Sequence, residues 1–310
     1  MMHRVRAIAE RVSNWGRWGA DDERGTLNLI TPEVVRRGSA CVRRGEVFNL
    51  GLSLGAEGPQ TGTVVGRFNP QHYMTAIGVQ IGDDPRGFHY SDDVLSLPLQ
   101  TATQWDSLAH VHYDGKLYNG FDAATALSAS GTTRNGIDKL AVQGIASRGV
   151  LVDVARHRGL ERVPPGSVIT SAEIDDALAA QGVSLLPGDI LVLRTGHLGV
   201  FKQDGDRETY LWQGPGIGLE AVEWIRRHDL AAVCSDTTAV EVMPCEDPAL
   251  LYPVHLLCIR DMGMPFGEMF DLDVLAADCA ADGCWEFLLC APPLKVTGGI
   301  GSPVNPVAIK

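Results

Sequence analysis

The sequence Thr103-Gln104-Trp105-Asp106-Ser107-Leu108-Ala109-His110-Val111-His112 holds the residues around which the rest of the chain is organised. It places an amide, a carboxylate and two imidazoles beside a tryptophan. Side chains of an extended segment alternate between faces, so Gln104, Asp106 and the two histidines could point the same way. Such oxygen and nitrogen donors bind Zn²⁺ and Mn²⁺. The spacing also fits an aromatic strand whose polar face hydrogen-bonds to the next loop, so it leaves both interpretations open.

Composition restricts the class of protein. The chain has 310 residues, of which 45% are hydrophobic and 21% charged, as in ordinary globular proteins. It has no apolar run of about 18 residues and no apolar leader segment, so we expect neither a membrane span nor a signal peptide. Seven cysteines without C-x-x-C spacing favour reduced thiols and a cytoplasmic location. A net charge of −12 argues against nucleic acid and anionic membranes as partners and leaves a small-molecule substrate.

Strand and helix patterns alternate along the chain. Apolar runs predict strands at 47–54, 149–154, 190–194 and 230–233, and helical spacing predicts helices at 137–146, 170–180 and 218–228. Thr31 before Pro32, and Thr170 three residues before Glu173, are typical of helix starts. This alternation indicates an α/β architecture. Residues 55–90 are rich in Gly and Pro, and we expect an irregular loop there, either covering a site or extending into solvent.

The central stretch resembles the signature of the metal-dependent cyclase family, which includes bacterial kynurenine formamidase, isatin hydrolase and trans-dienelactone hydrolase. The family pattern is H-x-G-T-H-x-D-x-P-x-H, and its Thr, Asp and last His coincide with Thr103, Asp106 and His110. Its first two His coincide with Gln100 and Gln104, so the chain is similar to the branch that carries Q-W-D-x-L-x-H. An amide oxygen is a weaker ligand than imidazole, so we expect one metal rather than two.

The resemblance extends from about residue 13 to 309. By itself, His255 in an apolar stretch is more typical of a core histidine. The family pattern, however, has a His followed about a dozen residues later by a Glu, and His255 and Glu268 match that order. The resemblance implies one domain over residues 1–310 with an N-terminal arm over about 1–30. It also implies an α/β fold with a mixed central β-sheet or barrel-like β core flanked by helices.

The resemblance also implies the roles of the site residues. His110 is either a ligand or the proton shuttle, and Glu268 is either a ligand or the general base. A bound Zn²⁺ or Mn²⁺ lowers the pKa of its water to about 7, so we expect hydrolysis of a lactone, cyclic amide or amide bond in a small cyclic or aromatic molecule. The expected metal ligands are Gln104, Asp106, His110 and His255, and the expected substrate contacts are Trp15, Trp105 and His112.

Other functions remain open at this point. A serine hydrolase would carry a G-x-S-x-G elbow, which the sequence lacks, and no cysteine has the context of a nucleophile. A metal-dependent lyase or cyclase acting on a carbonyl compound is the main alternative. A non-catalytic small-molecule binding protein is the other, because two family histidines are glutamines here. The family resemblance further implies a homodimer or homotetramer, in which arms such as residues 13–19 would be exchanged.

Overall fold

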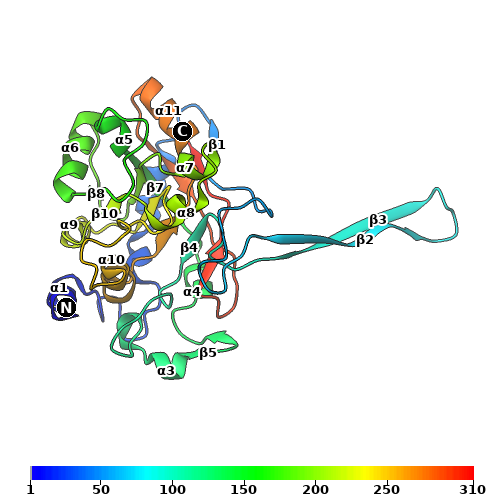
Figure 1. Cartoon of the computed structure of the whole chain (residues 1–310), viewed down its shortest axis with the longest axis horizontal. Coiled ribbons are helices and arrows are strands. Elements are labelled where there is room, and N and C mark those ends of the chain that lie inside the picture. Colours follow the sequence, from blue (N-terminus) through cyan, green and yellow to red (C-terminus); the bar gives the residue numbers. More distant parts are fainter. Residues whose placement is uncertain (1) are drawn as a thin grey trace.

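The computed structural model describes residues 2–310 (Figure 1). The α-helices are α1 (Met2–Val12), α2 (Pro32–Ser39), α3 (Ala123–Ala126), α4 (Ile137–Leu140), α5 (Val154–His157), α6 (Ser171–Gln181), α7 (Leu198–Lys202), α8 (Arg207–Trp212), α9 (Ala221–Arg227), α10 (Pro253–His255) and α11 (Asp273–Asp282). Short 3₁₀-helices span Gly25–Leu29 and Tyr118–Gly120, and a π-helix, η3, spans Leu256–Met262.

Nine strands form one mixed sheet with helices packed around it, in the order β1-β15-β13-β7-β9-β11-β12-β4-β14. Its centre, β7-β9-β11-β12, is parallel, and the outer strands are antiparallel. This confirms the predicted α/β fold with a mixed sheet. The strands of this sheet are β1 (Val47–Asn49), β4 (Gln104–Asp106), β7 (Ala146–Asp153), β9 (Ile190–Arg194), β11 (Ala232–Ser235), β12 (Phe266–Glu268), β13 (Glu286–Cys290), β14 (Gly301–Pro303) and β15 (Val307–Ile309).

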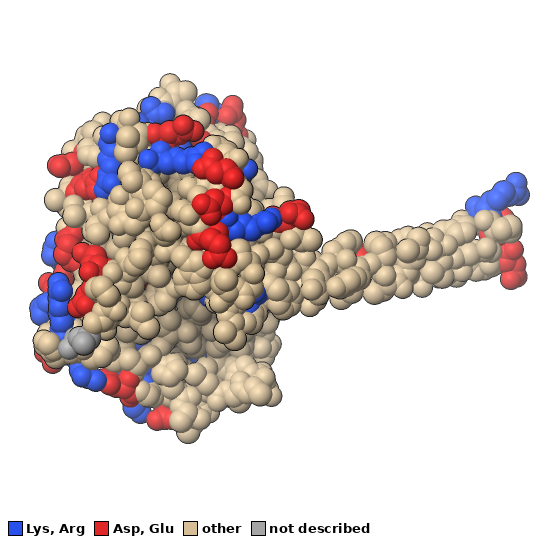
Figure 2. Space-filling view, in the orientation of Figure 1, with Lys and Arg blue, Asp and Glu red and all other residues tan. Residues whose placement is uncertain are grey.

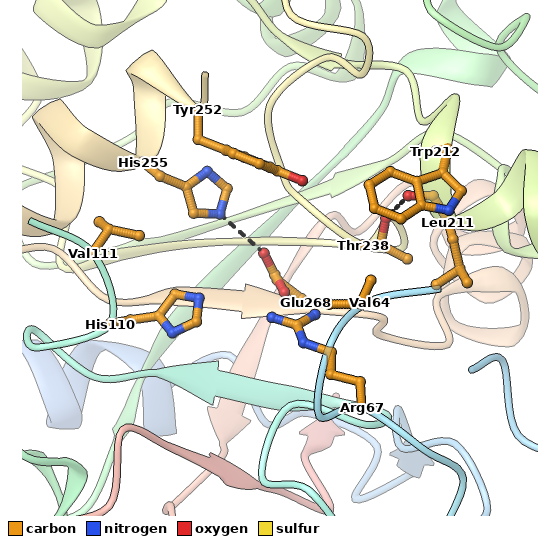
Figure 3. Close-up of a pocket in the computed structure, with 10 residues that line it drawn as sticks. All are labelled: Val64, Arg67, His110, Val111, Leu211, Trp212, Thr238, Tyr252, His255 and Glu268. Atoms are coloured by element: carbon orange, nitrogen blue, oxygen red, sulfur yellow. Dashed lines mark hydrogen bonds and ion pairs between the residues drawn. The ribbon is translucent and has the colours of Figure 1, made fainter. Parts of the chain in front are cut away.

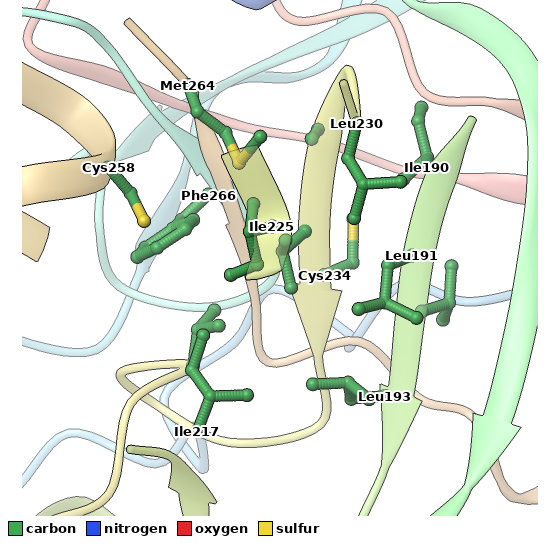
Figure 4. Close-up of a cluster of buried hydrophobic side chains, with 14 of the residues drawn as sticks. Ile190, Leu191, Leu193, Ile217, Ile225, Leu230, Cys234, Cys258, Met264 and Phe266 are labelled. Atoms are coloured by element: carbon green, nitrogen blue, oxygen red, sulfur yellow. The ribbon is translucent and has the colours of Figure 1, made fainter. Parts of the chain in front are cut away.

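The parallel strands at the centre of the sheet are buried, which is why they are continuous apolar runs in the sequence. The runs at 149–154 and 190–194 are β7 and β9, and the run at 230–233 is β11, displaced by two residues. Leu191 on β9 and Cys234 on β11 belong to one cluster with Phe266 on β12 (Figure 4). This core fixes the position of β12, the strand that carries Glu268.

Two helix starts form as the sequence predicts. The Thr31 side chain accepts a hydrogen bond from the Val34 N–H, and that of Thr170 accepts one from the Glu173 N–H. Other elements are shorter than predicted. The helix predicted at 137–146 ends at residue 140, and the strand predicted at 47–54 ends at Asn49, whose side chain accepts a hydrogen bond from the Gly51 N–H in a turn.

The segment 13–19 lies against its own chain. The Asn14 amide donates to the Met262 carbonyl at 2.8 Å, and the Trp15 indole donates to the Arg260 carbonyl at 2.9 Å. The Arg260 guanidinium stacks over the Trp15 ring at 4.3 Å. These contacts fix the segment on the helical layer formed by η3.

The prediction of an irregular loop over residues 55–90 was wrong for its second half. Residues Gln71–Ile81 form β2 and residues Phe88–Ser96 form β3, which pair with each other as a separate two-stranded sheet. This hairpin extends far from the body of the protein (Figure 1). Two further short sheets join β5 (Leu127–Ser128) to β6 (Gly131–Thr132) and β8 (Val168–Ile169) to β10 (Gly216–Ile217). Among residues 2–310, no helix has the length and apolarity needed to cross a membrane.

Candidate metal centre

Strand β4 separates two environments because its side chains alternate. Gln104 and Asp106 lie on one face, both fully buried, and Trp105 lies on the other. Gln104 is paired directly with Glu268 of β12, and its amide donates to the Glu268 carboxylate at 2.5 Å. The Trp105 ring packs edge-on against Phe270 in the hydrophobic core. Trp105, predicted as a substrate contact, therefore lies in the core.

Glu241 fixes the position and ring orientation of His255. The Glu241 carboxylate accepts hydrogen bonds from the backbone N–H groups of Val254 and His255, at 3.2 and 3.0 Å, and pairs with the His255 ring through Nδ1. The other ring nitrogen, Nε2, then faces Glu268 at 3.2 Å. A carboxylate on the far nitrogen fixes the orientation of a metal-binding imidazole and the tautomer that leaves Nε2 free.

Asp106, His255 and Glu268 come together in one buried cluster. Each offers one ligand atom, and these atoms lie within 4.8 Å of one another. Both carboxylate oxygens of Asp106 and the Oε1 atom of Gln104 are buried without a hydrogen-bond donor among residues 2–310. Buried acceptors rarely stay unpaired, and oxygen and imidazole donors are the ligands of divalent cations. The residues therefore fit one divalent metal ion.

The electrostatics of the cluster favour a cation at its centre. Burial raises the pKa of Asp106 well above its usual value, and the neighbouring Glu268 carboxylate raises it further. Burial by itself would lower the pKa of His255, but the hydrogen bonds with Glu241 and Glu268 raise it to about 10. Burial and the charge of His255 lower the pKa of His110 to about 3, so His110 is neutral. Without a metal, His255 therefore keeps a proton beside the acidic groups, and a cation bound by Asp106, His255 and Glu268 would take the place of that positive charge.

Three residues beside the cluster have a left-handed backbone. Val240 precedes Glu241, Met269 follows Glu268, and Tyr252 stands three residues before His255; their φ angles are 52°, 57° and 50°. Such angles are costly for residues with a Cβ, above all for a β-branched one, and they concentrate at functional sites. Each of the three therefore places a neighbouring site residue at a strained turn.

A pocket of about 240 Å³ opens onto the cluster (Figure 3). His110, in the turn after β4, lies beside it with its Nε2 atom 3.6 Å from Asp106 Oδ1. His110 thus faces the same space as His255 and Glu268, as the sequence predicts. The pocket is lined by Val64, Arg67, His110, Val111, Leu211, Trp212, Thr238, Tyr252, His255 and Glu268.

Two other predicted substrate contacts lie elsewhere. Trp15 lines a separate surface hollow together with Tyr113 and Arg260. The His112 side chain is exposed and is not part of the pocket lining. The alternation that would have placed His112 beside Asp106 ends at residue 106, where β4 stops.

Sequence reasoning missed four residues of this region: Glu241, Arg67, Trp212 and Tyr252. Glu241 lies in an irregular segment, and no local pattern connects it to His255 fourteen residues later. Arg67 lies in the Gly- and Pro-rich stretch 55–90, where no local pattern points to it. Tyr252 stands three residues before His255, and this closeness in sequence was the available signal.

Comparisons with known proteins place the fold in a family. A family model described as putative cyclase matches residues 48–242. A crystal structure described as a novel cyclase is 40% identical, with a TM-score of 0.88, and the match covers 97% of this chain and 99% of that one. Among curated proteins, none matches the chain.

More distant structures share the fold. Isatin hydrolase A from Labrenzia aggregata is 18% identical with a TM-score of 0.62, covering 87% of this chain and 94% of that one. A predicted metal-dependent hydrolase from Bacillus stearothermophilus is 14% identical with a TM-score of 0.52, covering 86% and 98%. The family match over most of the chain, together with the 40% identical structure, shows that this protein belongs to the cyclase family.

Proposed function

We propose that this protein is a metal-dependent hydrolase that opens an amide, cyclic amide or lactone bond of a small molecule. The observation that carries the proposal is the pair of buried, unpaired Asp106 oxygens facing His255 and Glu268 at the floor of a pocket. A buried carboxylate without a donor is costly unless a cation binds it. Family membership supports the same assignment.

The side chains of the site would have two kinds of role, metal binding and proton transfer. Asp106 and His255 would hold one Zn²⁺ or Mn²⁺, with Gln104 Oε1 as a weaker neighbouring donor. When bound, such an ion activates water and polarises a carbonyl group. Glu268 and His110 face the same pocket, so each can exchange a proton with the reacting water or the leaving group. Glu241 keeps the His255 ring in one orientation.

Metal content is the first test. We expect about one divalent ion per chain in purified wild-type protein, measured by mass spectrometry of the metal. Asp106→Ala should lose the ion and the activity while keeping the circular dichroism of the fold. Asp278→Ala, which changes a carboxylate far from the site, serves as the control. Full metal content in Asp106→Ala would refute the assignment.

Product mass is the second test. A protein of this fold is named isatin hydrolase, so cyclic aryl amides head a panel that also contains lactones and N-formyl aryl amines. Hydrolysis of a ring adds the mass of one water to the substrate. A product of unchanged mass would indicate an isomerase or cyclase, and loss of water would indicate a lyase.

The role of His110 is tested separately. If His110 transfers a proton, His110→Ala should keep the metal and lose turnover by about 10²–10⁴-fold. The loss should be smaller for activated aryl esters, whose leaving group needs no proton. Metal loss equal to that of Asp106→Ala would show that His110 is instead a ligand.

A further inference from the structure

Arg67 reaches the pocket from a closed loop. The Gln60 N–H donates to the Asn69 side chain at 2.8 Å, and the Asn69 amide donates back to the Gln60 carbonyl at 2.9 Å. Next to this closure, the Thr101 hydroxyl donates to the Phe68 carbonyl at 2.6 Å. These bonds fasten both ends of the loop, so Arg67 is presented to the pocket from a fixed base (Figure 3).

The Arg67 guanidinium forms no hydrogen bond or ion pair with residues 2–310, although its positive charge acts to lower the pKa of Asp106. Arg148 and Arg194, by contrast, each bind acidic side chains. Among the pocket-lining residues, Arg67 is the one Lys or Arg. A guanidinium presents planar pairs of N–H donors that match a carboxylate. The opposite wall of the pocket, with Leu211 and Trp212, is largely apolar.

We propose that Arg67 binds a carboxylate of the substrate that is not the group being hydrolysed, so that the substrate is a small organic acid. This inference rests on the proposed function, which assigns the floor of the pocket to the reacting bond. A pocket of about 240 Å³ lies below the roughly 300–1,000 Å³ of drug-sized ligand sites. The anionic group and the reacting bond must therefore be close together in a molecule of about one ring.

The test compares two probes that differ by one charge. Isophthalamide is neutral, whereas its mono-acid, 3-carbamoylbenzoate, carries one carboxylate in place of one of the two amides. Calorimetric titration of metal-loaded and metal-stripped protein gives the ratio of the two affinities in each form. A charge-assisted pair with Arg67 predicts that wild type prefers 3-carbamoylbenzoate by about 10- to 100-fold.

Arg67→Met should lose this preference, Arg67→Lys should keep part of it, and Arg86→Met, an exposed arginine at the hairpin tip, should keep all of it. No preference in wild type, or a preference that survives in Arg67→Met, would overturn the proposal. The ratio requires no turnover, and metal content is measured separately. Failure of the hydrolase assignment would therefore be seen independently.

Discussion

Glu241 acts on the candidate metal centre through His255, because it binds both the ring and the backbone N–H of that residue. Glu241→Gln keeps a similar shape but loses the negative charge that holds the Nδ1 proton. Removing such a partner typically weakens metal binding by 10–100-fold, so we expect a loss of about that size, with the fold retained. Titration of the metal-free protein with Zn²⁺ or Mn²⁺ measures it. Glu246→Gln is the control, because Glu246 accepts a hydrogen bond from the Leu219 N–H and does not touch His255; an equal loss in both variants would contradict the assignment.

His197 makes stability depend on pH. Burial lowers its pKa to about 4, so between about pH 6.5 and pH 4 the unfolded chain binds a proton that the folded chain does not. The free energy of unfolding should therefore fall as the pH falls through this range, by about 3 kcal/mol from this residue. Denaturant titrations of wild type and His197→Phe from pH 7 to pH 4 should show a flatter dependence in the variant.

Some residues of the site could be predicted from the sequence and others could not. Asp106, His255 and Glu268 match a family pattern, and the structure brings the three together. Glu241 carries no local signal, since its partner is defined only by the fold. His112 was misplaced because side chains alternate between faces only within a strand, and β4 ends at Asp106.

At the scale of elements, β4 has a core face and a site face. Trp105 lies on the core face, and its indole donates to the Ala291 carbonyl at 2.8 Å. Trp105→Phe should lower the free energy of unfolding by about 1–3 kcal/mol, because it leaves that carbonyl unpaired. Metal affinity should stay within about threefold of wild type, since Gln104 and Asp106 point the other way. A large change in affinity toward substrate without a change in stability would instead restore Trp105 as a substrate contact.

The elements that were predicted best are those that are buried on both faces, because such strands are continuous apolar runs in the sequence. The strands β7 and β9 are covered on both faces, and their apolar runs identify them. The hairpin was missed because Gly78, Gly82 and Pro85 dominated the interpretation of its region. The alternation of Ile77, Val79 and Ile81 was the available signal, and these side chains are exposed on a hairpin that is nearly uncharged between the body and its tip (Figure 2).

At the scale of the whole molecule, the metal centre couples function to stability. Asp106 and Glu268 place two buried carboxylates together, which is unfavourable without a cation. The metal-free Asp106→Asn protein should therefore be more stable than metal-free wild type, by about 1–3 kcal/mol. Metal at 100 times its dissociation constant should stabilise wild type by about 2.7 kcal/mol and leave the variant unchanged. Thermal unfolding with and without metal measures both effects, and a variant less stable than metal-free wild type would contradict them.

The position of β4 in the sheet has a consequence for synthesis of the chain. Its neighbours are β12, at residues 266–268, and β14, at residues 301–303, so the two sides of β4 are completed by segments that leave the ribosome about 160 and about 195 residues after Asp106. At about 5–20 residues per second, the strand waits on the order of 10–40 s for its partners. A chain that stops before residue 301 should therefore fail to bind metal even if its central strands have folded. We therefore expect ion uptake only after translation has passed β14.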